Sequence, residues 1–269
     1  MWADNTVVTC NSKRKSLAIF KKDIFGNFHF TKRILYFLFG SIAMYRFKRL
    51  YKTRVEGTHI LEKLPDNGVL FVSNHQTYFA DVAMMFLVFA SVKAGHKNKL
   101  GNFFSLFTPR LNSYFVAAME TMKSGILPKV FTYGGGILIK RTWREAGKEI
   151  NRQVDMRDIT KINEGLKDGW VVTFPQGTTT PYKAGRKGTV HIIKTNKPIV
   201  VPVVIDGFRR AFDKKGLQIK KKGTTLSVRF KEPIHIDYSK ENLEILKDIM
   251  KSIEQSEDCM PVTMLPDGD

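Results

Sequence analysis

A histidine and an aspartate, His75 and Asp81, have the chemistry of a catalytic pair. They follow the short apolar run at residues 69–73, which is typical of a buried strand, and sheet proteins place active sites beyond the carboxyl ends of such strands. Histidine suits the deprotonation of a hydroxyl near neutral pH, and a carboxylate beside it fixes its tautomer and stabilises the imidazolium. The pair therefore indicates a general base, although a structural histidine that caps the next helix has the same pattern.

A second chemical signal is the loop sequence FPQGTTT at residues 174–180, which follows another apolar run. Proline and glycine restrict such a loop, and its backbone N–H groups suit an anionic group when cations lie nearby. Three cations follow it, Lys183, Arg186 and Lys187. The pattern favours a site for an anionic headgroup. An ordinary strand-to-helix turn with solvated charges is the alternative.

A third signal is the cation pair Lys140 and Arg141, which ends the apolar run at residues 137–139. Two cations at the end of a strand suit a phosphate, to which arginine presents a pair of donors. Surface charge is the alternative interpretation of this pair.

Alternating strand and helix patterns must position these three groups. Short apolar or alternating runs bounded by turn residues predict strands, and longer periodic stretches predict helices. Their alternation predicts one α/β domain with a mostly parallel sheet covered by helices on both faces. The predicted strands are residues 53–57, 69–73, 134–141, 170–174, 197–205, 225–230 and 234–236, and the predicted helices are residues 81–92, 155–167 and 241–254.

The pattern of residues 30–52 predicts one further helix, which has an apolar and aromatic middle and cations at both ends. A basic amphipathic helix of this kind suits the headgroup region of an anionic membrane, and packing on the domain core is the alternative. We expect residues 1–52 to form an N-terminal basic segment with a membrane-associated helix, residues 53–256 the main domain, and residues 257–269 a tail.

The charge composition favours anionic partners. The 269 residues include 44 Lys and Arg against 25 Asp and Glu, a formal net charge of +19. A membrane surface fits better than a nucleic acid, because the aromatic residues lie mainly in apolar runs rather than among exposed cations. Cys10 and Cys259 have no metal-ligand spacing and favour a reducing compartment. We expect neither a cleavable signal peptide nor a spanning helix, which needs about 20 apolar residues.

In this order and spacing, the groups resemble those of the glycerolipid acyltransferase superfamily, which includes the lysophosphatidate (1-acylglycerol-3-phosphate) acyltransferases. The resemblance runs from about residue 55 to residue 206, with a lead-in Val-x-Gly at residues 55–57. The combination of blocks is specific, whereas no single block is. The four blocks are Asn74-His75 with Asp81, Gly136-Ile137-Leu138-Ile139-Lys140-Arg141, Phe174-Pro175-Gln176-Gly177-Thr178, and Val201-Pro202-Val203-Val204.

The resemblance implies an O-acyltransferase of phospholipid biosynthesis. His75, paired with Asp81, would deprotonate the hydroxyl of a lysolipid, which attacks the thioester of acyl-coenzyme A or acyl carrier protein. No metal, no cofactor and no covalent enzyme intermediate is implied. The expected location is the cytoplasmic face of a membrane, as a peripheral or monotopic protein. The residues expected to bind the acceptor are Lys140, Arg141, Gln176, Gly177, Thr178 and Arg186.

Three features of the sequence depart from the family pattern, one spacing and two residue types. Five residues separate His75 from Asp81 instead of four. Because one residue turns a helical side chain by about 100°, the extra residue must be absorbed before the helix. Gln176 stands where the family has glutamate, and Thr179 where it has arginine. A phosphate-binding acceptor site would then need another cation. The candidates are Arg141, Lys183, Arg186 and Lys187.

We therefore expect the chain to acylate lysophosphatidate. A lyso-aminolipid, such as an acylated ornithine or glycine lipid, is the close rival acceptor, because the changes at Gln176 and Thr179 remove fixed charges from the pocket. A non-catalytic lipid-binding relative, disabled by the altered spacing of the His/Asp pair, is a third hypothesis. The fourth hypothesis is a nucleic-acid-binding module.

Overall fold

The computed structural model describes residues 26, 28–107, 112–123, 132–140, 144–145, 148–149 and 156–261. Residues 1–25 and 262–269 lie outside the described residues, and with them Cys10, most of the predicted basic segment and most of the predicted tail. Arg141 lies outside the described residues as well.

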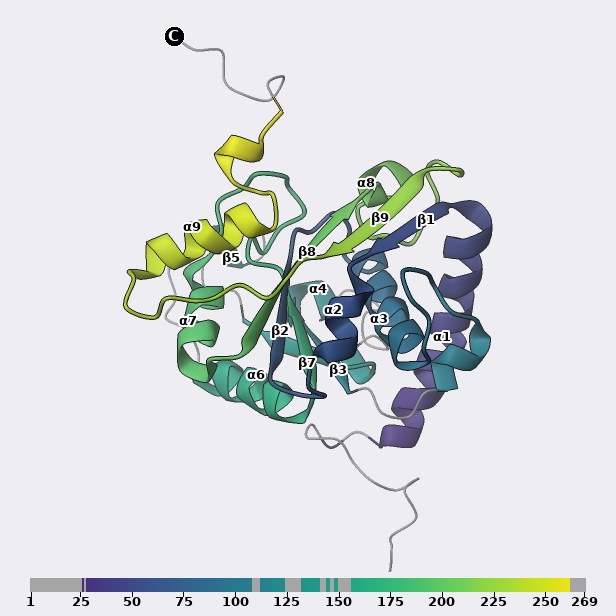
Figure 1. Ribbon diagram of the computed structural model, residues 1–269, viewed down its shortest axis with the longest axis horizontal. Coiled ribbons are helices and arrows are strands. Elements are labelled where there is room, and N and C mark those ends of the chain that lie inside the picture. Colours follow the sequence, from purple (N-terminus) through teal and green to yellow (C-terminus); the bar gives the residue numbers. More distant parts are fainter. Residues whose placement is uncertain are drawn as a thin grey trace, which may run out of the picture.

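Seven strands form one sheet: β1 (Lys52–Glu56), β2 (Val69–Ser73), β3 (Ser113–Ala118), β4 (Gly136–Ile139), β7 (Trp170–Thr173), β8 (Ile199–Asp206) and β9 (Thr225–Phe230). Their order across the sheet is β1-β9-β8-β2-β7-β3-β4 (Figure 1). All neighbours are parallel except β8 and β9, which confirms the predicted mostly parallel sheet. Two short strands, β5 (Arg144–Glu145) and β6 (Lys148–Glu149), pair separately.

Apart from the short strands β5 and β6, which are not predicted, the structure differs from the predicted strands at two places. β3 is a strand that the sequence patterns do not predict, and it lies between β7 and β4. Residues 234–236 are a predicted strand but form only a single antiparallel bridge, between Ile234 and Val200. Pro233 precedes this bridge and has no N–H to donate, so the ladder is not continued there.

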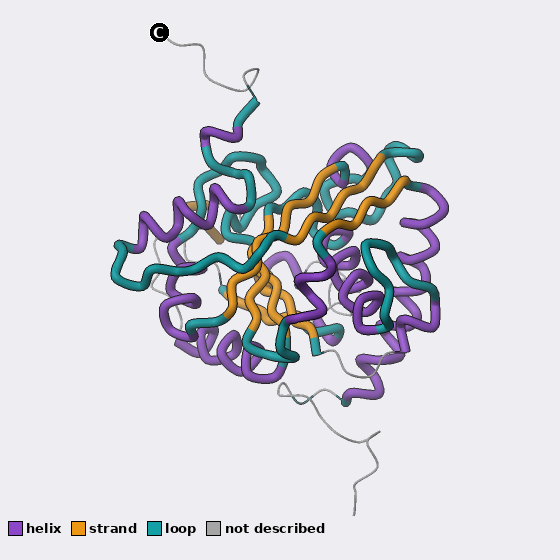
Figure 2. Tube along the Cα trace, in the orientation of Figure 1, coloured by secondary structure: helices purple, strands orange, loops and turns teal. Residues whose placement is uncertain are grey.

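Helices cover both faces of the sheet (Figures 1 and 2). One face carries α1 (His29–Leu50), α2 (Thr58–Lys63), α3 (Ala80–Lys93) and η2 (Phe103–Phe107); the other carries α6 (Met156–Asp168), α7 (Lys187–Asn196) and α9 (Asn242–Ser252). The central strand β2 packs against both layers, since Val69 and Phe71 join the first core and Leu70 the second. Successive side chains of a strand point to opposite faces. The remaining short helices are α4 (Met119–Lys123), α8 (Phe208–Ala211) and η3 (Glu257–Cys259).

The predicted N-terminal helix is present as α1, and it packs on the domain. Its residues Met44 and Phe47 are buried, and Phe47 contacts Phe208 and Phe212 edge-on. The opposite side of α1 is also apolar. A stripe of exposed side chains recurs there every three or four residues: Phe30, Ile34, Leu38, Ile42 and Tyr45. Among the described helices, none has the length and apolar character needed to cross a membrane.

The carboxyl ends of the parallel strands β2, β7 and β8 bring two of the three predicted chemical groups together, the His75–Asp81 pair and the FPQGTTT loop. β2 lies between β7 and β8, with Val72 opposite Thr173 on one side and Pro202 on the other. The loop after β2 carries His75, and the loop after β7 carries residues 174–180. Because the strands are parallel, both loops leave the same edge of the sheet.

Candidate active site

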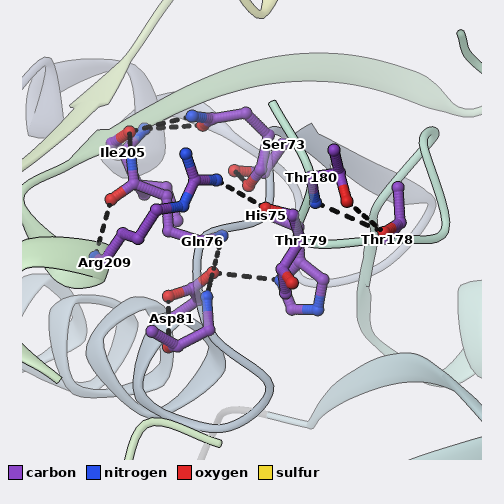
Figure 3. A network of polar contacts seen from close by, with 11 residues as sticks. Ser73, His75, Gln76, Asp81, Thr178, Thr179, Thr180, Ile205 and Arg209 are labelled. Atoms are coloured by element: carbon purple, nitrogen blue, oxygen red, sulfur yellow. Dashed lines mark hydrogen bonds and ion pairs between the residues drawn. The ribbon is translucent and has the colours of Figure 1, made fainter. Parts of the chain in front are cut away.

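The His75–Asp81 pair is assembled in the loop between β2 and α3. His75 follows the end of β2, and Asp81 is the second residue of α3. Their side chains meet, with Nδ1 of His75 3.0 Å from Oδ2 of Asp81 (Figure 3). The extra intervening residue is thus absorbed in the loop before the helix, as the pairing requires.

Asp81 is fully buried, and donors surround its carboxylate. Oδ2 also accepts the backbone N–H groups of Gln76 (2.6 Å) and Thr77 (2.9 Å), and Oδ1 accepts the hydroxyl of Thr77 (2.7 Å). An ionised carboxylate can only accept hydrogen bonds, so this set of partners suits it. His75 then donates its Nδ1 proton to Asp81, which leaves the lone pair on Nε2 for a proton from a substrate.

The imidazole of His75 is also held by the loop after β7. It stacks on Phe174, with ring centroids 3.9 Å apart and an angle of 21° between the planes. The side chain of His75 is 12% exposed, so part of it remains open to a substrate. The two signals that the sequence presents separately, the histidine and the FPQGTTT loop, therefore belong to one site.

Side chains on both sides of His75 fasten its loop to β8. The amide of Asn74 donates to the carbonyl of Ile205 (2.9 Å) and accepts its N–H (2.8 Å), in the manner of a strand partner. Gln76 donates to the same carbonyl (3.2 Å). The carbonyls of Lys214 and Lys215 accept the N–H groups of the last two loop residues before α3. The position of His75 thus depends on contacts from distant segments of the chain.

An apolar cavity of about 280 Å³ lies between α1 and α3. Phe79 and Ala80, just before Asp81, line it, so the cavity reaches the neighbourhood of the His75–Asp81 pair. Small residues leave room along both helices, including Gly40 on α1 and Ala83 on α3. A cavity with this lining can hold a hydrocarbon chain but offers little to a polar ligand.

Comparisons with known proteins agree with this architecture. The family model described as Acyltransferase matches residues 52–206, which is more than half of the chain and contains both loops of the site. The chain belongs to the Acyltransferase family. It is also similar in fold to the crystal structure of the 1-acyl-sn-glycerophosphate (LPA) acyltransferase PlsC from Thermotoga maritima. That similarity has a TM-score of 0.51 and 18% sequence identity, over 83% of this chain and 78% of PlsC. The comparison with curated proteins found no match.

Within this acyltransferase, Gln176 is turned into the protein. Its side chain is 1% exposed, and Nε2 donates to the carbonyl of Lys183 (3.0 Å) and to Oε1 of Gln255 (3.2 Å). Gln255 follows α9 and also accepts the N–H of Tyr182 (3.0 Å). The two glutamines therefore tie the FPQGTTT loop to the segment that follows α9. Acceptor binding by Gln176, Gly177 and Thr178 stays a prediction.

The predicted acceptor-binding cations lie at different distances from His75. Arg186 is half-buried, and its N–H donates to the carbonyl of Pro175 (2.8 Å), so it is beside the FPQGTTT loop. Lys183 and Lys187 are exposed. Lys140 is exposed after β4, which lies three strand spacings from β2, about 14 Å at the usual spacing. A phosphate role for Lys140 or Arg186 stays a prediction.

Arg209 is a site residue that the sequence patterns do not single out. It belongs to α8, after β8, and its guanidinium donates to the carbonyl of Thr179 (Figure 3). The sequence signal that could have found it is the one used for Lys140 and Arg141, since the pair Arg209-Arg210 also follows an apolar strand. Only the fold shows that the end of β8 lies beside His75.

Proposed function

We propose that this acyltransferase transfers a fatty acyl group from acyl-coenzyme A or acyl carrier protein to the hydroxyl of a lysolipid, 1-acylglycerol-3-phosphate above all. The observation that carries the proposal is the buried carboxylate of Asp81 held 3.0 Å from His75 Nδ1, which leaves Nε2 as a base. The likeness in fold to a lysophosphatidate acyltransferase supports the choice of acceptor class.

The proposed reaction proceeds by direct transfer. Nε2 of His75 takes the proton of the acceptor hydroxyl as its oxygen attacks the thioester carbonyl carbon. The tetrahedral intermediate collapses with cleavage of the carbon–sulfur bond, and the imidazolium returns its proton to the leaving thiolate. Asp81 stabilises the imidazolium during this interval, in the way that the carboxylate of a catalytic triad does.

The function is tested by following thioester cleavage with a panel of acceptors: lysophosphatidate, its choline ester, and a lyso-ornithine lipid. We expect lysophosphatidate to give the highest kcat/KM. Faster turnover of the aminolipid would mean that the acceptor is an aminolipid, while the assignment as an acyltransferase would stand. Absence of transfer to every acceptor by a protein that still binds lipid vesicles would point to a non-catalytic lipid-binding protein.

The apolar cavity between α1 and α3 is proposed to hold the acyl chain of the donor. Ala83→Leu adds three carbon atoms to a side chain that lines it. We expect kcat/KM for a long-chain thioester to fall about tenfold or more, with a much smaller effect on a short-chain one, since each displaced methylene is worth about 1 kcal/mol or more.

The control for this prediction is Ala94→Leu, the same substitution at an exposed position just after α3. It should leave the chain-length preference unchanged. An Ala83→Leu variant with an unchanged ratio of long-chain to short-chain activity would contradict an acyl site in this cavity.

We further propose that α1 binds the cytoplasmic surface of an anionic membrane, as part of a peripheral or monotopic attachment. Its exposed apolar stripe continues onto η2, where Phe103, Phe104 and Phe107 are exposed and Phe107 packs against Phe37 of α1. Exposed cations stand near the helix ends, among them Arg33 and Arg49. Exposed apolar side chains rimmed by cations suit a lipid headgroup layer.

Leu38→Ser tests this attachment. Leu38 is 53% exposed in the stripe, and burying a leucine in lipid is worth roughly 1.5–3 kcal/mol, so vesicle affinity should fall about tenfold or more. Removing all of α1 would be a poor test, because Met44 and Phe47 belong to the core.

Leu243→Ser supplies the matched control for Leu38→Ser. Leu243 is 52% exposed on α9, which covers the opposite face of the sheet. Replacing this leucine by serine should leave binding to anionic vesicles unchanged in a flotation assay. Equal binding by the Leu38→Ser variant and the wild type would show that α1 is only structural.

A further inference from the structure

Arg209 is fixed at the active-site edge by the turn that ends β8. Gly207 in this turn has φ +91°, and a Cβ at that position would lie 2.0 Å from the carbonyl oxygen of Thr225, so the turn requires glycine. Beyond it, the N–H of Arg209 donates to Oε1 of Gln76 (3.2 Å), the residue that follows His75. The base and the arginine are therefore positioned by one connected set of contacts.

The guanidinium of Arg209 extends to the FPQGTTT loop, and most of its N–H donors have no acceptor among the described residues. It donates to the carbonyl of Thr179 and is half-buried (Figure 3). Within the described part of the chain, no carboxylate lies at ion-pair distance from it, and Thr179 is the one acceptor of its side-chain donors. Arginine has five N–H donors, so a full positive charge and several donors remain for a ligand.

The neighbouring Arg210 differs from Arg209 because an ion pair neutralises its charge. Its guanidinium pairs with the carboxylate of Asp206 at 2.7 Å, and both side chains are well exposed. Arg210 therefore offers no comparable charge to the site. The two consecutive arginines therefore have different partners although they share the same backbone turn.

The chemistry of the proposed acceptor demands a cation at this place. In 1-acylglycerol-3-phosphate the reacting hydroxyl and the phosphate are on adjacent carbons, so a hydroxyl at His75 brings the phosphate close to the same loop. Burying a phosphate dianion without a cation is prohibitive, and arginine matches its oxygens with paired donors. Lys140 is three strand spacings away, whereas Arg209 touches the residues on both loops.

We propose that Arg209 binds the phosphate monoester of the acceptor lipid and determines the preference for it. This assignment rests on the proposed lysolipid acyltransfer. It places a guanidinium against Thr179, where the FPQGTTT loop itself has no cation.

Binding of two unreactive probes tests the assignment. The first is an ether analogue of lysophosphatidate that lacks the acceptor hydroxyl, and the second is the choline ester of that analogue. Both are titrated by calorimetry in neutral mixed micelles into the full-length wild type and the variants Arg209→Gln, Arg209→Lys and Arg210→Gln. Arg209→Gln should raise Kd for the monoester about tenfold or more, because a charge-assisted pair of hydrogen bonds is lost.

The other variants and the second probe distinguish phosphate binding by Arg209 from a purely structural role of its side chain. Arg209→Lys should have an intermediate effect, since it keeps the charge but not the paired donors. The choline ester should bind to wild type and Arg209→Gln alike, and Arg210→Gln, which removes the same charge, should match wild type with both probes. With turnover, Arg209→Gln should raise KM for lysophosphatidate and leave KM for the thioester unchanged.

Three results would overturn the assignment: an equal loss of both probes in Arg209→Gln, an equal effect of Arg210→Gln, or wild-type protein that binds neither probe. A different result would overturn only the proposed function. In that case the wild type binds the monoester through Arg209 but transfers no acyl group to lysophosphatidate.

Discussion

Replacement of His75 by alanine is expected to reduce kcat for acyl transfer by about 10²–10⁴-fold, the usual contribution of a positioned general base. No other imidazole stands in this loop, and the lone pair of Nε2 has no substitute once the ring is gone. The variant should still fold, because the side chain of His75 is partly exposed and the buried carboxylate of Asp81 retains the donors on Gln76 and Thr77. The measurement is thiol release with lysophosphatidate and a saturating acyl thioester.

His191→Ala is the matched control for the loss of an imidazole. His191 is exposed on α7, on the other face of the sheet, and its replacement should leave kcat unchanged. Both variants should have wild-type circular dichroism spectra. A folded His75→Ala protein that retains wild-type turnover would rule out the proposed mechanism.

The sequence predicts the loop of His75 and Asp81 because its signals are local. An apolar strand followed by a histidine and the start of a helix specifies which end of the strand carries His75. The extra residue before Asp81 is accommodated for a local reason too. The carboxylate accepts the N–H groups of Gln76 and Thr77, and so shapes the loop that brings it to the histidine.

The contributions of β8, α8 and the C-terminal helix escape sequence reasoning because they depend on distant contacts. Asn74 pairs with Ile205, which is 131 residues away, and Arg209 donates to Thr179, which is 30 residues away. Periodicity carries no information on such pairs. The change from glutamate to glutamine at Gln176 looks like a change in the acceptor pocket, yet the fold buries that side chain against Gln255.

Asp81→Asn is expected to reduce kcat by about 10²–10⁴-fold while the protein stays folded, because the imidazolium loses its counter-charge. The remaining amide oxygen can still accept from the backbone N–H groups of Gln76 and Thr77, and the amide NH₂ can donate to the hydroxyl of Thr77. The loop should therefore keep its shape. Asp81→Ala should also lower the free energy of unfolding by about 3–5 kcal/mol, since it leaves several buried donors without partners.

The double variant His75→Ala/Asp81→Asn decides whether the two residues act together. If the role of Asp81 is exerted through the imidazole, removing the carboxylate from a protein without that ring has no further catalytic consequence. We therefore expect the double variant to have the kcat of His75→Ala alone, in the same thiol-release assay, instead of the product of the two single losses. Urea unfolding of all three variants separates this catalytic coupling from a change in stability. Multiplicative losses would mean that Asp81 supports catalysis by another route, such as the shape of the loop. The 3.0 Å contact between His75 and Asp81 would then not be a catalytic interaction.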